Sequence, residues 1–357
     1  MSLSYLSIFQ FFLLIFCFIG FSQKGNAAAQ SPQATQWSIT KNFAKGKKAR
    51  EGLSGAACAA KGGEKTGCVI VNDEKNYAQF FTLDQQNRII KPGKTIRLLP
   101  KKDKNGQVFQ EMDAEAASYD NGFFYVTGSH GKSRKKCQTE DARYTILRFP
   151  VKQNSGKPTF RKYGRSVSEQ IEHSQKLRDI IRKAKHVGGV YADKKCLNEG
   201  GTNIEGLAVV KGEMFLGFRA PSVEGQAVIM QLPVSAVFDG KTAVPQMHLL
   251  KLGPRVGIRD IAKVSGGLLI VGGATVKTDE QDITPSLYFW NLESKKLTKL
   301  AELPRSQGAK IETLLVLQDT KTASKIKYKI LVFYESTANG DPVEFEISRN
   351  VSDMYSQ

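Results

Sequence analysis

Acidic residues with similar surroundings recur along the chain and are the first candidates for chemistry. Each is followed by small or apolar residues, as in Asn203-Ile204-Glu205-Gly206-Leu207, and in four of the five segments a turn and an apolar strand come next. The acidic positions are Glu51, Glu115, Glu205, Asp260 and Glu312.

Carboxylates that meet at one place repel one another and need a cation, a basic partner or a raised pKa. Ca²⁺ suits such a site, because it accepts several oxygen ligands in loose geometry. Residues i and i+2 of a strand share a face, so Lys310 joins Glu312, whereas Arg50 and Arg259 point away from their neighbouring acids. The predicted calcium ligands are Glu51, Asp113, Glu115, Asn203, Glu205, Asp260 and Glu312. Alternatively, these acids bond backbone N–H groups at the strand ends.

A second candidate site is the basic, glycine-containing segment 128–136, which follows an apolar strand. Backbone N–H groups and several cations in such a turn could hold an anion. The triplet at 131–133 is similar to the end of a phosphate-binding loop, but position 126, where the first glycine belongs, is Val126. An exposed basic loop tip is the alternative. The predicted anion contacts are His130, Lys132, Arg134, Arg219 and Arg259.

The elements that must position these residues are short strands. Apolar runs rich in β-branched and aromatic residues alternate with turns of Gly, Asn, Asp and Lys, which indicates an all-β fold. The spacing of the acidic segments predicts a β-propeller of about six blades whose inner strands face a central channel. A β-sandwich is the alternative. Residues 30–357 are expected to form one domain, with an inserted segment at about 152–202 that contains a helix near 168–185.

Four cysteines follow residue 29 and suggest disulfides. Cys58 and Cys68 flank a Gly-rich turn that could bring them together, and the remaining pair is then Cys137 with Cys196. Free or metal-bound thiols are the alternative, although no C-x-x-C spacing is present.

The first 29 residues predict export from the cytoplasm. An apolar run at 5–21 is followed by three alanines at 27–29, the layout of a signal peptide, although no Lys or Arg precedes the run. A retained membrane anchor is the alternative. After cleavage we expect no stable membrane span and a periplasmic or extracellular location. The net charge of +18 favours an anionic small molecule or glycan as partner, or simply reflects a basic, well-solvated surface.

Several segments together resemble the domain of unknown function 3616 family of exported, β-propeller-like bacterial proteins. They are residues 54–58, 72–74, 128–130, 203–208, 215–221, 226–229 and 257–261. Phe218 and Ala220 depart from the family's more usual Leu-Arg-Gly-Pro sequence. The resemblance implies a propeller-like fold and no known activity.

Two functions remain open on this basis. The first is binding of an anionic ligand or partner at the channel mouth, which fits the lack of any nucleophile–base motif such as G-x-S-x-G or H-E-x-x-H. The second is calcium-dependent hydrolysis of phosphate esters or lactones by metal-bound water. The sequence shows only a weak pattern of basic strands with interleaved aromatic residues, which nucleic-acid binding would require, so nucleic acid is not an expected partner.

Overall fold

A computed structural model describes residues 32–43, 46–59, 65–102, 106–134, 136–151, 170–306 and 308–352. The expected signal peptide at 1–29 and part of the expected inserted segment, 152–169, lie outside these residues. Within the described residues no helix combines the length and the apolar character needed to cross a membrane.

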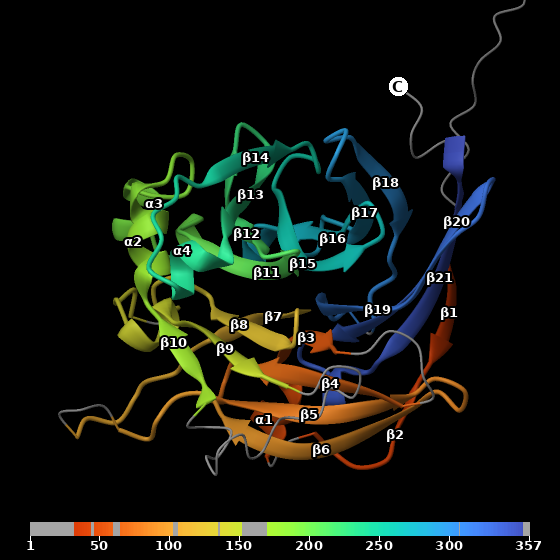
Figure 1. Ribbon diagram of the computed structural model, residues 1–357, viewed down its shortest axis with the longest axis horizontal. Coiled ribbons are helices and arrows are strands. Elements are labelled where there is room, and N and C mark those ends of the chain that lie inside the picture. The colour runs from red at the N-terminus through yellow and green to blue at the C-terminus, as the bar shows by residue number, and fades with distance from the viewer. Residues whose placement is uncertain are drawn as a thin grey trace, which may run out of the picture.

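The strands of the described residues form five sheets, antiparallel except for one short edge strand, that stand around one axis like blades (Figure 1). Blade 1 consists of β3 (Leu53–Cys58), β4 (Lys65–Asn72), β5 (Tyr77–Asp84) and β6 (Ile89–Arg97), with the short β2 (Ser38–Ile39) parallel to β6. Blade 2 consists of β7 (Ala114–Asp120), β8 (Phe123–Gly128), β9 (Ile146–Pro150) and β10 (Glu172–Ser174). Blade 3 consists of β11 (Asn203–Val210), β12 (Glu213–Val223), β13 (Gln226–Pro233) and β14 (Gln246–Leu250).

Blade 4 consists of β15 (Val256–Val264), β16 (Gly267–Ala274), β17 (Ser286–Asn291) and β18 (Leu297–Glu302). Blade 5 joins the two ends of the described chain. Its strands are β19 (Ile311–Lys321), β20 (Lys325–Tyr334), β21 (Val343–Asn350) and, paired antiparallel with β21, the early strand β1 (Gln33–Gln36). The inner strands β3, β7, β11, β15 and β19 contact one another in a closed ring.

The β-propeller predicted from the repeats is confirmed, with five blades rather than about six. Among the described residues, the long interval between Glu115 and Glu205 holds no extra blade. It contains the outer strands of blade 2 and short helices at the rim, α2 (Lys176–Lys183) and α3 (Val190–Asp193). The helix expected near 168–185 is therefore shorter, because Glu172–Ser174 pairs with β9 as the outermost strand of blade 2.

The hydrophobic core is divided among the gaps between neighbouring blades. Five clusters of buried side chains are found among the described residues, and each joins two adjacent blades. Between blades 5 and 1, for example, Phe43, Phe81 and Phe333 meet edge to face. Both faces of each sheet are thus buried, which explains the nearly continuous apolar runs in the sequence.

Small residues let the inner strands approach closely near the axis. A Cβ atom on Gly55 of β3 would lie 2.4 Å from the Cα atom of Ala116 in β7. The two predicted disulfides are also confirmed. Cys58–Cys68 links β3 to β4 with a Cα separation of 4.0 Å, and Cys137–Cys196 links two loops with a separation of 5.3 Å.

Candidate functional site at the channel mouth

Every inner strand carries a β-bulge near its start, and the bulges define the true repeat. The register of each inner strand with its neighbour skips one residue. A bulge re-aims the extra side chain away from the regular ladder. The skipped residues are Gly55, Glu115, Glu205, Arg259 and Glu312.

This register corrects the alignment drawn from the sequence. In blade 4 the channel residue is Arg259, not Asp260. Asp260 turns to the neighbouring strand, where its carboxylate accepts the backbone N–H groups of Ile261 and Leu314, both at 2.7 Å. In blade 1 the channel position is Gly55. Glu51 instead ends helix α1 (Lys47–Glu51) and pairs with Lys47 at 3.8 Å.

One half of the channel is closed by what we call the arginine clamp, formed by Arg259, Glu205 and Glu312. The Arg259 guanidinium lies 2.9 Å from Glu205 and also bonds Glu312. All three side chains are almost completely buried. Burial opposes ionisation, but Arg259 and then Arg219 hold the pKa of Glu205 below its usual range. The acids of the clamp are therefore neutralised by arginine.

Further polar residues support the clamp from the solvent side. Asn203 Nδ2 donates to Glu205 at 2.9 Å, and Arg219 donates to Glu205 and Glu280, both at 3.0 Å. Lys310 lies 3.1 Å from Glu280 and 3.4 Å from Glu312. The expectation that residues i and i+2 share the channel face thus holds for Asn203 with Glu205 and for Lys310 with Glu312.

The other half of the channel contains the carboxyl cluster, defined as Asp73, Asp113 and Glu115. Asp113 bonds Arg143 within its own blade. Asp73 and Glu115 instead face one nitrogen of Arg134, at 4.0 and 3.9 Å. These separations exceed a direct hydrogen bond. Asp73 Oδ1 and Glu115 Oε1 are buried and have no hydrogen-bond partner among the described residues.

The carboxyl cluster is therefore poorly compensated. Burial, and then the neighbouring Asp113, raise the pKa of Asp73 to about 8. Burial, followed by Asp113 and Glu205, raises the pKa of Glu115 well above its usual value. At neutral pH Asp73 therefore stays largely protonated, and burial disfavours the ionised form of Glu115, so neither carboxyl group binds Arg134 strongly.

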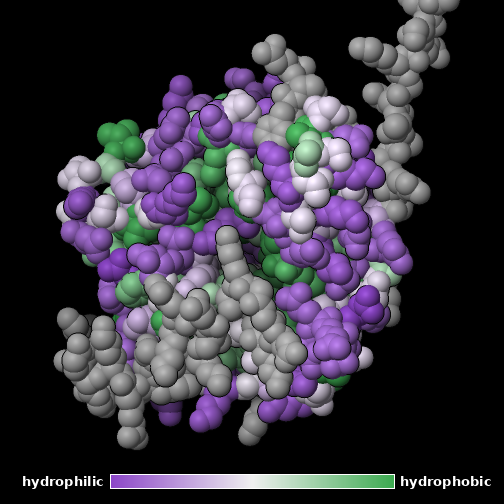
Figure 2. Space-filling model, turned by 45° about the vertical axis from the view of Figure 1, so that its right-hand side comes forward, coloured by the Kyte–Doolittle hydropathy of each residue, from purple (hydrophilic) through white to green (hydrophobic). Residues whose placement is uncertain are grey.

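A cavity of about 350 Å³ opens above these groups, at the end of the channel where the inner strands begin. Its cationic lining residues are Arg134, Arg219, Lys277 and Lys310, its acids are Glu280 and Glu335, and Asn198, Asn203, Thr275 and Ser336 add neutral polar groups. A second cavity of about 460 Å³ shares Glu280, Lys310, Glu335 and Ser336 with it and continues over blade 5. In the view of Figure 2, hydrophilic side chains cover most of the visible described surface.

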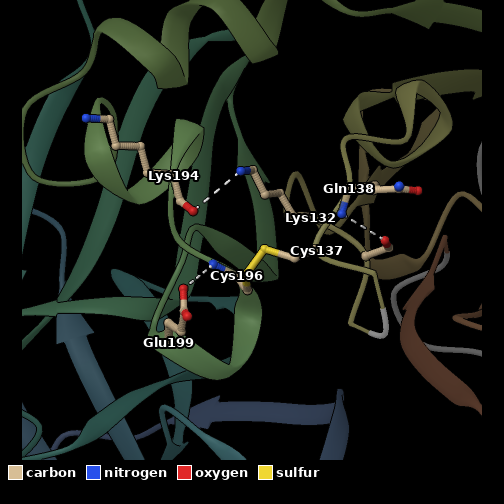
Figure 3. Close-up of a disulfide and its surroundings, with 7 residues drawn as sticks. Lys132, Cys137, Gln138, Lys194, Cys196 and Glu199 are labelled. Atoms are coloured by element: carbon tan, nitrogen blue, oxygen red, sulfur yellow. Dashed lines mark hydrogen bonds between the residues drawn. A yellow bond between two sulfur atoms is a disulfide. The ribbon is translucent and has the colours of Figure 1, made fainter.

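Three residues predicted to contact an anion do not line this cavity, and one of them, Arg259, is buried in the clamp. Lys132 points to the backbone carbonyl of Lys194 at 3.5 Å (Figure 3). His130 is buried edge to face against Tyr144, and burial lowers its pKa to about 3.

The Cys137–Cys196 disulfide fixes two parts of the mouth relative to each other (Figure 3). It joins the loop that carries Arg134 to the short helix η3 (Leu197–Glu199), whose Leu197 and Asn198 line the cavity. Arg134 is thus held over the cavity by a covalent link.

Calcium ligation requires several oxygen ligands around one point. Among the described residues, no three His, Cys, Asp or Glu side chains are grouped closely enough to hold a metal ion. Glu205 and Glu312 are both engaged by Arg259, and Asp113 by Arg143.

Family comparison agrees with the fold. The sequence model described as "Protein of unknown function (DUF3616)" matches residues 52–341. The chain belongs to this family. No curated protein matches the chain.

Solved structures that are similar include three carbohydrate-active enzymes. An exo-β-1,3-galactanase from Phanerochaete chrysosporium shares 8% identity at a TM-score of 0.44, covering 90% of this chain and 64% of that protein. Zg3597, a family 117 glycoside hydrolase from Zobellia galactanivorans, shares 8% at 0.43, covering 90% and 91%. An α-L-arabinanase from Cellvibrio cellulosa shares 9% at 0.42, covering 87% and 92%.

Sequence reasoning missed part of the site. The sequence does contain a signal that aligns Arg259 with the channel acids. In blades 3, 4 and 5 an isoleucine immediately precedes the bulged residue, namely Ile204, Ile258 and Ile311. Asp73, by contrast, stands at the end of β4 and reaches Arg134 only through the packing of blade 1 on blade 2. No local pattern could have paired them.

Proposed function

We propose that this protein binds a small anionic ligand in the channel mouth. The observation that carries the proposal is that the Arg134 guanidinium is accessible from the cavity and is not engaged by a close partner. Its side chain is 46% exposed, lines the cavity and makes no hydrogen bond among the described residues. Burial raises the pKa of both carboxyl groups that face it, that of Asp73 to about 8 and that of Glu115 well above its usual value. The planar guanidinium is therefore free to donate two parallel hydrogen bonds to an anion.

The surroundings of Arg134 support the same proposal. Arg219 and Lys277 add positive charge to the lining, whereas Glu280 is already bonded by Arg219 and Lys310. We favour binding over calcium-dependent hydrolysis, because Glu205 and Glu312 are already paired with Arg259, whose positive charge opposes a second cation there. The two disulfides fit an oxidising compartment, and we propose that the protein acts after export.

Sulfate is a suitable first probe, because its charge does not change between pH 5 and pH 9. Calorimetric titration at pH 7 and low ionic strength should detect binding to the wild type. Arg134→Ala should weaken the affinity by about tenfold or more, the equivalent of ~1.4 kcal/mol. Arg134→Lys should lie between the two, because an ammonium keeps the charge but loses the bidentate geometry.

Arg88→Ala is the matched control. Arg88 has a similar exposure, 50%, and a similarly loose ion pair, 3.9 Å to Glu344. It lies in the turn between β5 and β6, outside both cavities. An equal loss of affinity in Arg88→Ala and Arg134→Ala would mean that sulfate responds to overall charge and would refute the site.

A further inference from the structure

The floor of the mouth contains a hydrogen-bond acceptor that lacks a donor. Asn203 lines the cavity and is 3% exposed. Its Nδ2 donates to Glu205 Oε1, and because the ionised Glu205 only accepts, the orientation of the amide is fixed. Asn203 Oδ1 then has no hydrogen-bond partner among the described residues. A buried carbonyl oxygen in this state calls for a donor from a bound molecule.

Other acceptors stand beside Asn203. Glu280 and Glu335 line the same cavity, and the hydroxyl groups of Thr275 and Ser336 add neutral polar contacts. A lone arginine site would fit any anion. The mouth instead combines one free guanidinium with several acceptors, so the ligand should carry both a negative charge and hydrogen-bond donors.

Those donors are better supplied by hydroxyl groups than by an ammonium group. Glu280 is already bonded by Arg219 and Lys310, and Lys310 also lies 2.5 Å from Glu335. The acids are thus compensated in charge while keeping unused lone pairs. A cationic ligand group would meet the positive charges of Arg219 and Lys310, whereas a neutral hydroxyl meets no such repulsion.

We infer that the ligand is a polyhydroxylated acid of the sugar-acid class, such as a uronate, whose carboxylate binds Arg134 and whose hydroxyl group donates to Asn203 Oδ1. This inference rests on the proposed function and specifies its ligand. The second cavity continues from the first through Glu280, Lys310, Glu335 and Ser336. It provides room for a further unit, so the end of an acidic oligosaccharide fits as well as a single sugar acid.

Three probes separate the requirements in the wild-type protein. D-galacturonate has a six-membered ring, a carboxylate and hydroxyl groups; cyclohexanecarboxylate keeps the ring and charge without hydroxyl groups; D-galactose keeps hydroxyl groups without the charge. By calorimetry at pH 7, galacturonate should bind at least tenfold more tightly than either of the others. Equal affinity for galacturonate and cyclohexanecarboxylate would overturn the inference.

Variants assign the contacts. Asn203→Ala should weaken galacturonate binding by about tenfold and leave cyclohexanecarboxylate unchanged, whereas Arg134→Ala should weaken both. If Asn203→Ala weakened the binding of galacturonate and of cyclohexanecarboxylate equally, the proposed role of the Asn203 carbonyl oxygen would be contradicted. Thr275→Val, an isosteric change in the same lining, is a second variant if Asn203→Ala does not fold. Failure of every anion to bind, sulfate included, would instead refute the proposed function.

Discussion

The two halves of the channel use the same residue types to opposite effect. In the arginine clamp, Arg259 lies 2.9 Å from Glu205, and the pKa of that acid is lowered. In the carboxyl cluster, Arg134 stays 3.9–4.0 Å from Glu115 and Asp73, and the pKa values of both acids are raised. Distance and exposure of the arginine make the difference, since Arg259 is buried and Arg134 is half exposed.

The difference separates a structural role from a binding role. An arginine that is buried between two acids holds neighbouring blades together and is not accessible to a ligand. An arginine that faces acids whose pKa is raised keeps its charge available. Three predictions test this contrast, in order of decreasing effect.

Removing the clamp arginine should have the largest effect on stability. Arg259→Met removes the cation that pairs with both buried acids and leaves Glu205 with Arg219 and Glu312 with Lys310, so the free energy of unfolding should fall by about 3 kcal/mol. Glu115→Gln in the carboxyl cluster should change it by less than about 1 kcal/mol, because burial already disfavours the charged form of that carboxyl. Urea unfolding at pH 7 measures both. Similar losses in the two variants would show that the halves do not differ.

The two halves should also respond to pH in opposite directions. The pKa of Glu205 is lowered in the fold, so the clamp's contribution is present above about pH 4.5 and is lost on acidification. The pKa of Asp73 is raised from 3.8 to about 8, so its contribution is complete below pH 3.8 and is lost as the pH rises towards 8.

Asp73→Asn isolates the alkaline part of this response. Between pH 5 and pH 8, the wild type should lose about 2 kcal/mol relative to the variant, roughly half of the 1.4 kcal/mol per pH unit of an ideal group. Parallel unfolding curves across this range would contradict a protonated Asp73. Burial also lowers the pKa of His130 to about 3, which adds to the loss of stability below pH 6.5 in both proteins.

The smallest effect concerns affinity. As Asp73 ionises near pH 8, its carboxylate competes with the ligand for Arg134, so sulfate affinity should fall about tenfold between pH 6 and pH 9, or ~1.4 kcal/mol. Asp73→Asn should retain most of its affinity at pH 9. A variant that loses affinity as steeply as the wild type would place the titrating group elsewhere.

The fold could be predicted because its signals are local and repeated. Apolar runs of strand length, turns and the recurring acidic residue followed by small or apolar residues belong to single blades. The blade count could not be predicted from the sequence, because the long interval between Glu115 and Glu205 is also compatible with a weak extra repeat. Only the pairing of β10 with β9 assigns this segment to blade 2.

The site could be predicted in part. Glu115, Glu205, Glu312 and Arg134 were singled out from the sequence and lie at the channel or its mouth. Which acid meets which arginine could not be read from the sequence, because contacts such as Arg259 with Glu312 depend on the packing of one blade against the next.

The shared sheet of β1 and β21 has a consequence for how the molecule is completed. During synthesis from the N-terminus, β1 is made first but cannot pair until β21, near the other end of the described chain, has been made. Four blades can assemble beforehand, but the circle stays open. Deletion of residues 343–346 would therefore remove the pairing with β1 and open the ring, and would not merely shorten one strand.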